Sequence, residues 1–600
     1  MSRIDRRWFA LFVTLAATVT VTPGCDRTAP DAGQTQGRTE GASIRGGFID
    51  VAADLGIDFA IDRSLSGDYF LPDSMTAGCA LFDYDNDGDL DLYIVNAFRN
   101  GKGESTTPEG ANRLYRQEAD GQMVDVTDAA GVGDRGFGQG VTTGDIDNDG
   151  DLDLYVANYE ADVLYRNEGN GTFTDVSTAA GIANDQWAVS AGFGDLDGDG
   201  YLDLYVCNYL ALDESVKQFD PAGRPEYPGP SIFDGTLDVL YRNNGDGTFS
   251  DVSEPAGVAV RPGKGLGVVF GDLDGDDAID IYVANDGEPN FAWIQTGPMQ
   301  FEDRALTMGL AVNTFGRPEA SMGIGYGDVD ADGDFDLFIG HLVRETNTLY
   351  RQVAPGVYQD DTIPAGLAPG SLDFTAFGAA FLDVELDGDL DVVVGNGRVV
   401  RKLARADAIG LNPHWTPYAE PNQLLLNDGT GRFADADAAT AGDLARHVEV
   451  SRGLCVGDLD GDGDLDVVIS NSNGSIRVYR NEFARAGHWL AVRAVDPALG
   501  RDALGAVIEV GAGERRFRRI VRTAHSYASA SPPETHFGLG AVTTLDELIV
   551  EWPDGLVESF EGGPVDVRRT VERGAGTIVR TRNIRSAYGG GGRGASPGRP

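Results

Sequence analysis

The chain has 600 residues, 42% of them hydrophobic, and its 95 acidic and 47 basic residues give a formal net charge of -48 at pH 7. This length exceeds one small domain, and the hydrophobic content is ordinary for a globular protein. So large an excess of negative charge argues against nucleic acid and against an anionic membrane surface as partners.

Residues 1–25 have the features of an export signal. Arginines precede an apolar run over 8–21 that is too short to span a bilayer, and Cys25 follows. Arg6 and Arg7 resemble a twin-arginine signal, and the end of the segment resembles a bacterial lipoprotein cleavage site. We predict an exported protein, periplasmic, envelope-anchored or extracellular, with Cys25 lipidated or, alternatively, with simple cleavage. Membrane contact is expected only through that anchor.

Residues 26–47 lack periodicity and aromatic side chains, which predicts a flexible linker. The segment FIDVAADLGI, starting at Phe48, is typical of a strand followed by a turn. Its place in the fold becomes clear only from the repeats that follow.

Seven acidic loops of nine residues then recur along the chain. Carboxylates at loop positions 1, 3, 5 and 9 and a backbone carbonyl at position 7 are the hard oxygen ligands that Ca²⁺ prefers. Four like charges in so short a loop repel one another unless a cation lies between them. We therefore predict up to seven Ca²⁺ ions.

The predicted calcium ligands, with position 7 acting through its carbonyl, are Asp83, Asp85, Asp87, Asp89 and Asp91; Asp145, Asp147, Asp149, Asp151 and Asp153; Asp195, Asp197, Asp199, Tyr201 and Asp203; Asp272, Asp274, Asp276, Ala278 and Asp280; Asp328, Asp330, Asp332, Asp334 and Asp336; Asp383, Glu385, Asp387, Asp389 and Asp391; and Asp458, Asp460, Asp462, Asp464 and Asp466. Two loops depart from the pattern. Asp277 replaces the usual Gly at position 6 of the fourth loop, and Glu385 is one methylene longer at position 3 of the sixth.

An EF-hand begins in the same way but needs a bidentate Glu at position 12 and flanking helices. Position 12 is Ile or Val in all seven loops, and short β-branched and aromatic runs such as LDLYVAN follow. These runs predict strands. Each calcium loop therefore joins two β-strands.

A second signature, such as VLYRNEGNGTFTDV from Val163, predicts two further strands after each loop. Loop spacings run from 50 residues (Asp145 to Asp195) to 77 (Asp195 to Asp272), which are lengths of propeller blades with insertions. The last repeat lacks its fourth strand, which Phe48 and Val51 supply by pairing with residues 476–479. We predict an all-β fold with a closed ring of seven blades.

These repeats resemble the FG-GAP or VCBS repeats of integrin-type β-propellers. Residues further on resemble the ASPIC/UnbV domain, by the motifs Arg501-Asp502-Ala503, Gly505-Ala506, Ser526-Tyr527, His536-Phe537-Gly538-Leu539-Gly540 and Trp552-Pro553. The resemblance implies an extracellular calcium-binding protein and brings no established catalytic residues. We predict a signal at 1–25, a linker at 26–47, a propeller at 48–484, an ASPIC/UnbV domain at 485–575 and a disordered tail at 576–600.

Loop position 14 is Asn in six repeats and His341 in the fifth. An Asn at a fixed strand end is expected to cap a turn through its amide, which makes His341 a variant turn residue. The other histidines have no zinc spacing, and Ser526 lacks the GxSxG elbow of a nucleophile. Cys79, Cys207 and Cys455 are expected to be buried small side chains, with a bridge between Cys79 and Cys455 as the alternative.

Three long insertions, 97–112, 209–236 and 397–421, lie on the side of the blades opposite the calcium loops. They contain Phe98, Tyr209, Phe219, Tyr227, Phe233, Trp415 and Tyr418. Long loops on a rigid scaffold often carry binding residues, although such loops also serve only for packing.

The sequence thus predicts a non-catalytic, calcium-stabilised binding or adhesion module at the cell envelope, whose partner is an extracellular protein or glycan. An enzyme acting on extracellular polysaccharide or another polymer is the alternative, and a purely structural envelope protein is a third interpretation.

Overall fold

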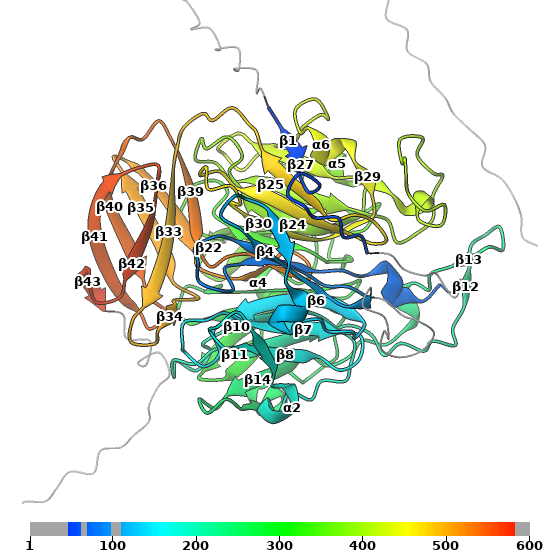
Figure 1. The fold of residues 1–600 in the computed structure, drawn as a ribbon, viewed down its shortest axis with the longest axis horizontal. Helices are drawn as coiled ribbons and strands as arrows, with labels where there is room; N and C mark the ends of the chain where they lie inside the picture. Colours follow the sequence, from blue (N-terminus) through cyan, green and yellow to red (C-terminus); the bar gives the residue numbers. More distant parts are fainter. Residues whose placement is uncertain (1–45, 62–68, 98–109, 582–600) are drawn as a thin grey trace, which may run out of the picture. The chain divides into compact units, whose positions relative to one another are not determined.

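The computed structural model describes residues 46–61, 69–97 and 110–581 (Figure 1). Within these residues the fold is all-β, as predicted, with only short helices between strands. The predicted signal with Cys25, the linker before residue 46 and the tail from residue 582 lie outside the described residues. No helix in the described part is both long enough and apolar enough to cross a membrane.

Six four-stranded antiparallel sheets, together with strands β2 to β5 of a six-stranded sheet, form the seven blades of a β-propeller. From the inner to the outer strand they are β2 (Cys79–Phe82), β3 (Asp91–Ile94), β4 (Arg113–Gln117) and β5 (Met123–Asp125); β6 (Gly138–Gly144), β7 (Asp153–Asn158), β8 (Val163–Asn167) and β9 (Phe173–Asp175); β10 (Ala188–Gly194), β11 (Asp203–Asn208), β14 (Val239–Asn243) and β15 (Phe249–Asp251); β16 (Gly265–Gly271), β17 (Asp280–Asn285), β18 (Phe291–Gly297) and β19 (Gln300–Asp303); β20 (Ile324–Gly327), β21 (Asp336–Ile339), β22 (Thr348–Ala354) and β23 (Val357–Asp360); β24 (Ala376–Leu382), β25 (Asp391–Asn396), β27 (Gln423–Asn427) and β28 (Phe433–Asp435); and β30 (Ser451–Gly457), β31 (Asp466–Asn471), β32 (Arg477–Asn481) and β1 (Phe48–Asp50).

The inner strands contact one another in cyclic order, and β30 returns to β2. The ring is closed by β1, which pairs with β32 through Phe48 opposite Asn481 and Asp50 opposite Tyr479. The N–H of Val51 then donates to the carbonyl of Val478 over 2.8 Å. The predicted closure by the N-terminal strand is confirmed, although the paired residues lie slightly later in β32 than predicted.

One-turn helices follow the outer strands of six blades: α1 (Thr127–Ala130), α2 (Ser177–Ala180), α3 (Ser253–Ala256), α4 (Ala305–Met308), α5 (Ala368–Ser371) and α6 (Asp443–Arg446). In the first, the Asp125 carboxylate accepts hydrogen bonds from both the N–H and the hydroxyl of Thr127. That hydroxyl oxygen accepts the N–H of Leu114 over 2.9 Å. Ser177, Ser253 and Thr362 make the same bond, so in four blades this hydroxyl ties the outer turn to the third strand of its own blade.

Adjacent blades are joined by a repeated side-chain hydrogen bond that the sequence analysis missed. The last residue of the third strand, or its equivalent, is Asn or Gln, and its amide donates to the carbonyl of loop position 2 in the preceding blade. The seven bonds run from Gln117 to Leu459 (2.8 Å), Asn167 to Tyr84 (2.8 Å), Asn243 to Ile146 (2.8 Å), Gln295 to Leu196 (2.5 Å), Gln352 to Leu273 (3.2 Å), Asn427 to Val329 (2.8 Å) and Asn481 to Val384 (3.0 Å). They make a complete circuit of the ring.

The C-terminal region forms two further sheets. One is β34 (Arg501–Asp502), β33 (His488–Asp496) and β39 (Thr535–Gly540), with β42 (Val567–Glu572) parallel to β33; the other is β36 (Arg515–Ile520), β35 (Val507–Ala512), β40 (Thr544–Glu551), β41 (Leu556–Pro564) and β43 (Thr577–Thr581). Because β43 pairs with β41, residues 577–581 are a strand and not part of a disordered tail. The core of these sheets continues into the propeller at Ile146 and Leu202.

A hairpin from this C-terminal region, β37 (Ala524–His525) and β38 (Ser529–Ala530), lies against the inner strands of the propeller. Ser526 donates its N–H to the carbonyl of Ile324 on β20, and Ala528 accepts the N–H of Val141 on β6. Ala530 pairs with Ala80 on β2. A Cβ on Gly78 would lie 1.9 Å from the carbonyl oxygen of Ala528, so this close approach requires glycine.

The same hairpin bonds to three further inner strands. The Ser190 hydroxyl on β10 donates to Leu266, while its oxygen accepts the N–H of Ala528. Ser526 Oγ accepts the N–H of Ala379 on β24, and Ser531 Oγ accepts that of Val456 on β30. With β16 also in contact with β37, the hairpin touches all seven inner strands and fills the centre of the ring.

We expect ring closure to depend on the buried face of β1. Phe48 is 0% exposed and packs edge-on against Phe483, whereas Ile49 on the same strand is 45% exposed. Phe48→Ala should lower the free energy of unfolding by about 3 to 5 kcal/mol, because it leaves a cavity in the core. Ile49→Ala should change it by no more than about 0.5 kcal/mol. Equal losses in denaturant unfolding would contradict this assignment.

We expect the amides between blades to contribute to stability. Asn243 is buried and bonds to the preceding blade, while Asn244 is exposed and bonds only to Thr248 and Ser250 in its own turn. Asn243→Ala should cost about 1 to 3 kcal/mol, since it leaves buried polar groups without partners. Asn244→Ala serves as the control and should cost far less. Thermal unfolding of the two variants beside the parent protein tests this.

Candidate metal centres

Each acidic loop begins directly after an inner strand and ends where the second strand of the same blade starts. In the first loop the backbone is left-handed at Asn86 (φ 57°) and Gly88 (φ 96°), which are positions 4 and 6. Asp277 adopts the same conformation (φ 72°) in place of glycine, as its tolerance of that region predicts. All seven loops therefore follow one path.

This path gathers the predicted ligands. In five of the loops, three carboxylates each place one oxygen atom within 4.8 Å of the others. The sets are Asp83, Asp85 and Asp91; Asp145, Asp147 and Asp153; Asp195, Asp197 and Asp199; Asp272, Asp274 and Asp276; and Asp328, Asp330 and Asp332. Oxygen atoms so arranged match the donor set of a calcium site.

The carboxylates at loop position 3 give the most direct evidence for a cation. One oxygen of each is buried and has no hydrogen-bond partner in five of the loops, namely in Asp85, Asp147, Asp274, Asp330 and Glu385. A buried carboxylate oxygen is costly without a partner. A divalent cation at the centre of the loop would supply that partner, and Glu385 fits this pattern despite its greater length.

The protonation behaviour of the loops agrees with this. Burial, reinforced by the charge of Asp276, raises the pKa of Asp274 to about 6. Burial and the neighbouring Asp387 raise the pKa of Glu385 to about 7. Without a cation, therefore, these carboxyl groups of the fourth and sixth loops take up protons at a higher pH than free side chains do.

The carboxylate at loop position 9 has a second role, because both its oxygens accept backbone N–H groups. In the second loop Asp153 accepts from Ile146 at position 2 over 2.8 Å and from Asn167 on the third strand over 2.7 Å. Asp91, Asp203, Asp280, Asp336, Asp391 and Asp466 make the same pair of bonds in the other loops. The residue predicted only as a ligand also anchors the loop to its blade.

Arginines already oppose some of these charges. Arg242 on the third strand contacts Asp197 at 2.5 Å and Asp199 at 2.8 Å. Arg351 contacts Asp330 at 2.7 Å in the fifth blade. This arginine belongs to the LYR motif and was not predicted as a site residue, although an arginine precedes the Asn or Gln of the third strand in five of the seven repeats.

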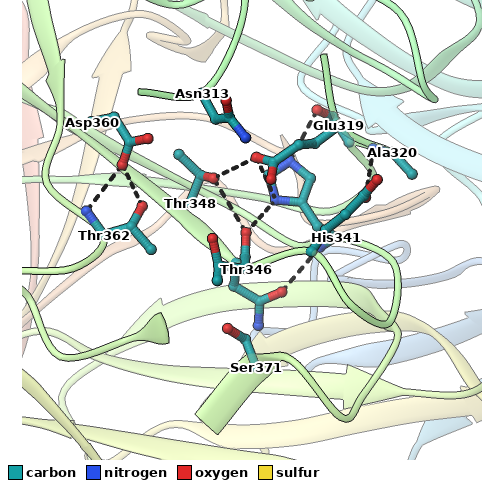
Figure 2. A network of polar contacts seen from close by, with 12 residues as sticks. Asn313, Glu319, Ala320, His341, Thr346, Thr348, Asp360, Thr362 and Ser371 are labelled. Atoms are coloured by element: carbon teal, nitrogen blue, oxygen red, sulfur yellow. Dashed lines mark hydrogen bonds and ion pairs between the residues drawn. The ribbon is translucent and has the colours of Figure 1, made fainter. Parts of the chain in front are cut away.

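The turn after the second strand is capped as predicted. In the second blade the N–H of Asn158 donates to Asp162, and its amide donates to the carbonyl of Ala161 over 2.9 Å. His341 takes the same place in the fifth blade: its N–H donates to Asn347, and Nδ1 lies 2.9 Å from the carbonyl of Thr346 (Figure 2).

Burial lowers the pKa of His341, although the charge of Glu319 opposes that shift, so the ring is neutral at pH 7. Nδ1 then carries the proton that it donates to Thr346, and Nε2 accepts the hydroxyl of Ser321 over 3.1 Å. Ser321 and His341 are each only 1% exposed. Their contacts are those of a buried turn.

The remaining histidines are dispersed. His447 lies beside Tyr479, His488 beside Asp566, and His536 Nε2 lies 2.9 Å from the carbonyl of Gly463. His525 contacts Ser531 and not Ser526. The Oγ of Ser526, in the central hairpin, accepts the N–H of Ala379 on β24. The hydrogen bonds of Ser526 therefore hold the hairpin against the inner strands.

The cysteines of the described part are free and buried, which agrees with their interpretation as packed small side chains. Cys79 on β2 and Cys455 on β30 lie with their sulfur atoms 3.1 Å apart, and Cys207 lies in β11. Cys79 and Cys455, for which a disulfide bridge was the alternative, are therefore two free thiols in contact.

Most aromatic side chains of the three insertions are buried, so they are not free to contact a ligand, and recognition by these insertions stays a prediction. Tyr209, Tyr227, Phe233, Trp415 and Tyr418 are all buried, and Tyr227 stacks on Trp415 with ring centroids 5.8 Å apart. The insertions pack against each other because their large rings bury more apolar area together than apart. Phe219 is 60% exposed, and Phe98 lies outside the described residues.

The insertions contain little regular structure: β12 (Gln218–Phe219) pairs with β13 (Pro225–Glu226), and β26 (Glu420–Pro421) pairs with β29 (Val448–Glu449). Short 3-10 turns, η1 (Leu71–Ser74), η3 (Pro230–Ile232) and η4 (Thr416–Tyr418), complete this face.

Comparison with known families agrees with these repeats. The model of the FG-GAP-like repeat matches residues 83–156, 145–206, 231–283, 272–339 and 405–469. The model named ASPIC and UnbV matches residues 497–578. A solved lectin structure from Agrocybe aegerita, described as recognising non-reducing terminal N-acetylglucosamine, aligns with a TM-score of 0.35 at 14% identity over 66% of this chain and 87% of that one.

Cartilage acidic protein 1 from Mus musculus is 26% identical over 528 residues, covering 84% of this chain and 65% of that protein. The Homo sapiens protein is 25% identical over 84% of this chain and 64% of its own length, and the Xenopus tropicalis protein is 26% identical over 52% and 44%. The chain thus spans less than two thirds of the length of these relatives. It carries FG-GAP-like repeats and an ASPIC and UnbV domain, and over most of its length it is similar to cartilage acidic protein 1.

Proposed function

We propose that this protein is an exported calcium-binding propeller that acts as a non-catalytic binding or adhesion module at the cell envelope. The observation that carries the calcium assignment is the set of buried, unpartnered carboxylate oxygens at loop position 3. Up to seven Ca²⁺ would be held by the loop carboxylates and the position 7 carbonyls. The ion would supply charge neutralisation and a fixed coordination geometry for each loop.

The role as a binding module is supported by the FG-GAP-like repeats, the ASPIC and UnbV domain and the similarity to cartilage acidic protein 1. We propose an extracellular protein or glycan as the partner, with Cys25 as an anchor to the membrane. A pull-down from envelope extracts and a glycan array, each run with calcium and with chelator, test this part. Retention of no envelope protein and no glycan in either condition would contradict it.

We expect calcium to stabilise the fold, because only the native state arranges the carboxylates around a cation. Extracellular calcium modules bind with dissociation constants of about 0.1 to 1 mM. At free calcium about ten times the dissociation constant, each filled site adds about 1.4 kcal/mol to stability. The melting temperature should therefore fall steeply when EDTA is added, and Mg²⁺ should restore little of it. An unchanged melting temperature would refute calcium stabilisation.

We expect two substitutions in the first loop to distinguish a ligand that binds through its side-chain carboxylate from one that binds through its backbone carbonyl. Asp85 has a buried oxygen without a partner, whereas Asp89 at position 7 is expected to act only through its backbone carbonyl. Both Asp85→Asn and Asp89→Asn remove one charge from the same loop. Native mass spectrometry in limiting calcium should show about one ion fewer for Asp85→Asn and the parent number for Asp89→Asn. The same loss in both would mean that net charge alone determines binding.

A further inference from the structure

A pocket of about 400 Å³ lies where the C-terminal sheets meet the calcium-loop side of the propeller. The C-terminal region contributes Arg519 and Arg522, and the loops contribute Asp83 and Asp383 among other lining residues. This volume is within the range of pockets that hold small molecules. None of these side chains belongs to the rim that the sequence suggested for binding.

Two guanidinium groups in this pocket have buried nitrogen atoms with no hydrogen-bond partner. They are Nε and Nη2 of Arg519 and Nη1 of Arg522. Each guanidinium group also donates one hydrogen bond: Arg519 Nη1 donates to the carbonyl of Arg518 (2.9 Å), and Arg522 Nη2 donates to the carbonyl of Tyr326 (2.6 Å). Buried donors on permanently charged groups are costly when left unpaired, and they recognise carboxylate or phosphate oxygens well. The unmet donors therefore indicate an anionic ligand.

Part of the negative charge in the pocket is already neutralised by neighbours. Asp502 is paired with Arg493 at 2.6 Å. Asp458 lies 2.9 Å and Glu534 3.8 Å from Arg568. These three carboxylates are not available to Arg519 and Arg522.

The two other acidic side chains that line the pocket, Asp83 and Asp383, stand at position 1 of the first and sixth calcium loops. In the absence of an ion, Arg519 is attracted first to Asp328 in the fifth loop and then to Asp383 and Asp389 in the sixth. When Ca²⁺ occupies these two loops, their carboxylates would be engaged by the ion. The positive charges of Arg519 and Arg522 are then left uncompensated inside a partly enclosed space, where electrostatic interactions are stronger than in water.

Part of the wall is apolar and includes Phe335, Phe381, Leu390, Leu465 and Ile520. A free inorganic anion would leave this surface uncovered. A ligand with an oxyanion group at one end and an apolar body at the other would satisfy the arginines and cover the wall.

We propose that this pocket binds a small organic anion, with Arg519 and Arg522 donating to its oxyanion group and the apolar part of the wall covering its body, and that calcium in the fifth and sixth loops promotes this binding. The inference rests on the proposed calcium binding and adds a ligand site at the junction with the C-terminal sheets. It assigns to Arg519 and Arg522 a binding role in addition to packing.

The test uses the full-length protein and titration calorimetry with sodium benzoate and sodium sulfate at equal ionic strength. Benzoate should bind in calcium and bind at least about tenfold more weakly to the double variant Arg519→Gln and Arg522→Gln, since the variant loses the charged donors to the carboxylate. Arg516→Gln is the matched control, because Arg516 lies on β36 together with Arg519 but its side chain is exposed. Each single variant is included in case the double variant does not fold.

The parent protein is also titrated after calcium has been removed on a chelating resin, at a temperature below its melting point. Weaker benzoate binding without calcium is expected. Equal binding to the parent and the arginine variants, or no binding of benzoate in calcium, would overturn the inference. Binding of sulfate but not benzoate would overturn the inference that the ligand is an organic anion. If calcium fails to raise the melting temperature, the proposed function fails as well; if calcium stabilises but benzoate does not bind, only this inference fails.

Discussion

The carboxylate at loop position 9 is the interaction on which the rest of the propeller depends. In the second loop Asp153 holds the start of the loop through Ile146 and the third strand through Asn167. Asn167 in turn donates its amide to the carbonyl of Tyr84 in the preceding blade. One buried carboxylate thus anchors the loop and the third strand of its own blade, and Asn167 links that strand to the preceding blade. The same arrangement recurs around the ring.

This arrangement explains why the acidic loops tolerate so much charge. The loops are not free turns, because strand hydrogen bonds hold both of their ends in place before any cation binds. The carboxylates at positions 1 and 3 are consequently held close together at a cost in repulsion. A divalent cation at the centre of each loop would offset that repulsion, and the strand hydrogen bonds already hold the carboxylates that would bind it.

Much of this architecture follows from the sequence, because repeats report structure directly. The acidic loops, the apolar residue at position 12 and the unpaired last blade were enough to predict seven sheets and closure by Phe48. The amide of Asn243 and the hairpin around Ser526 were not predicted, because each acts across elements that are distant in sequence. The choice between binding and packing for the aromatic side chains was open for a related reason. Tyr227 and Trp415 belong to different blades, and only the folded chain shows that they stack.

The arginines divide the seven loops into two kinds. In the third loop Arg242 already contacts Asp197 and Asp199, and Arg501 of the C-terminal region lies 3.8 Å from Asp195. In the seventh, Arg568 contacts Asp458 and Arg485 contacts Asp462. Arg304 contacts Asp274 in the fourth loop and Arg351 contacts Asp330 in the fifth, so protein charges offset part of the repulsion in four loops. Among the described residues, Asp85 and Asp147 make no such ion pair. Under the proposed calcium binding, the first two loops would therefore gain more from the ion than these four.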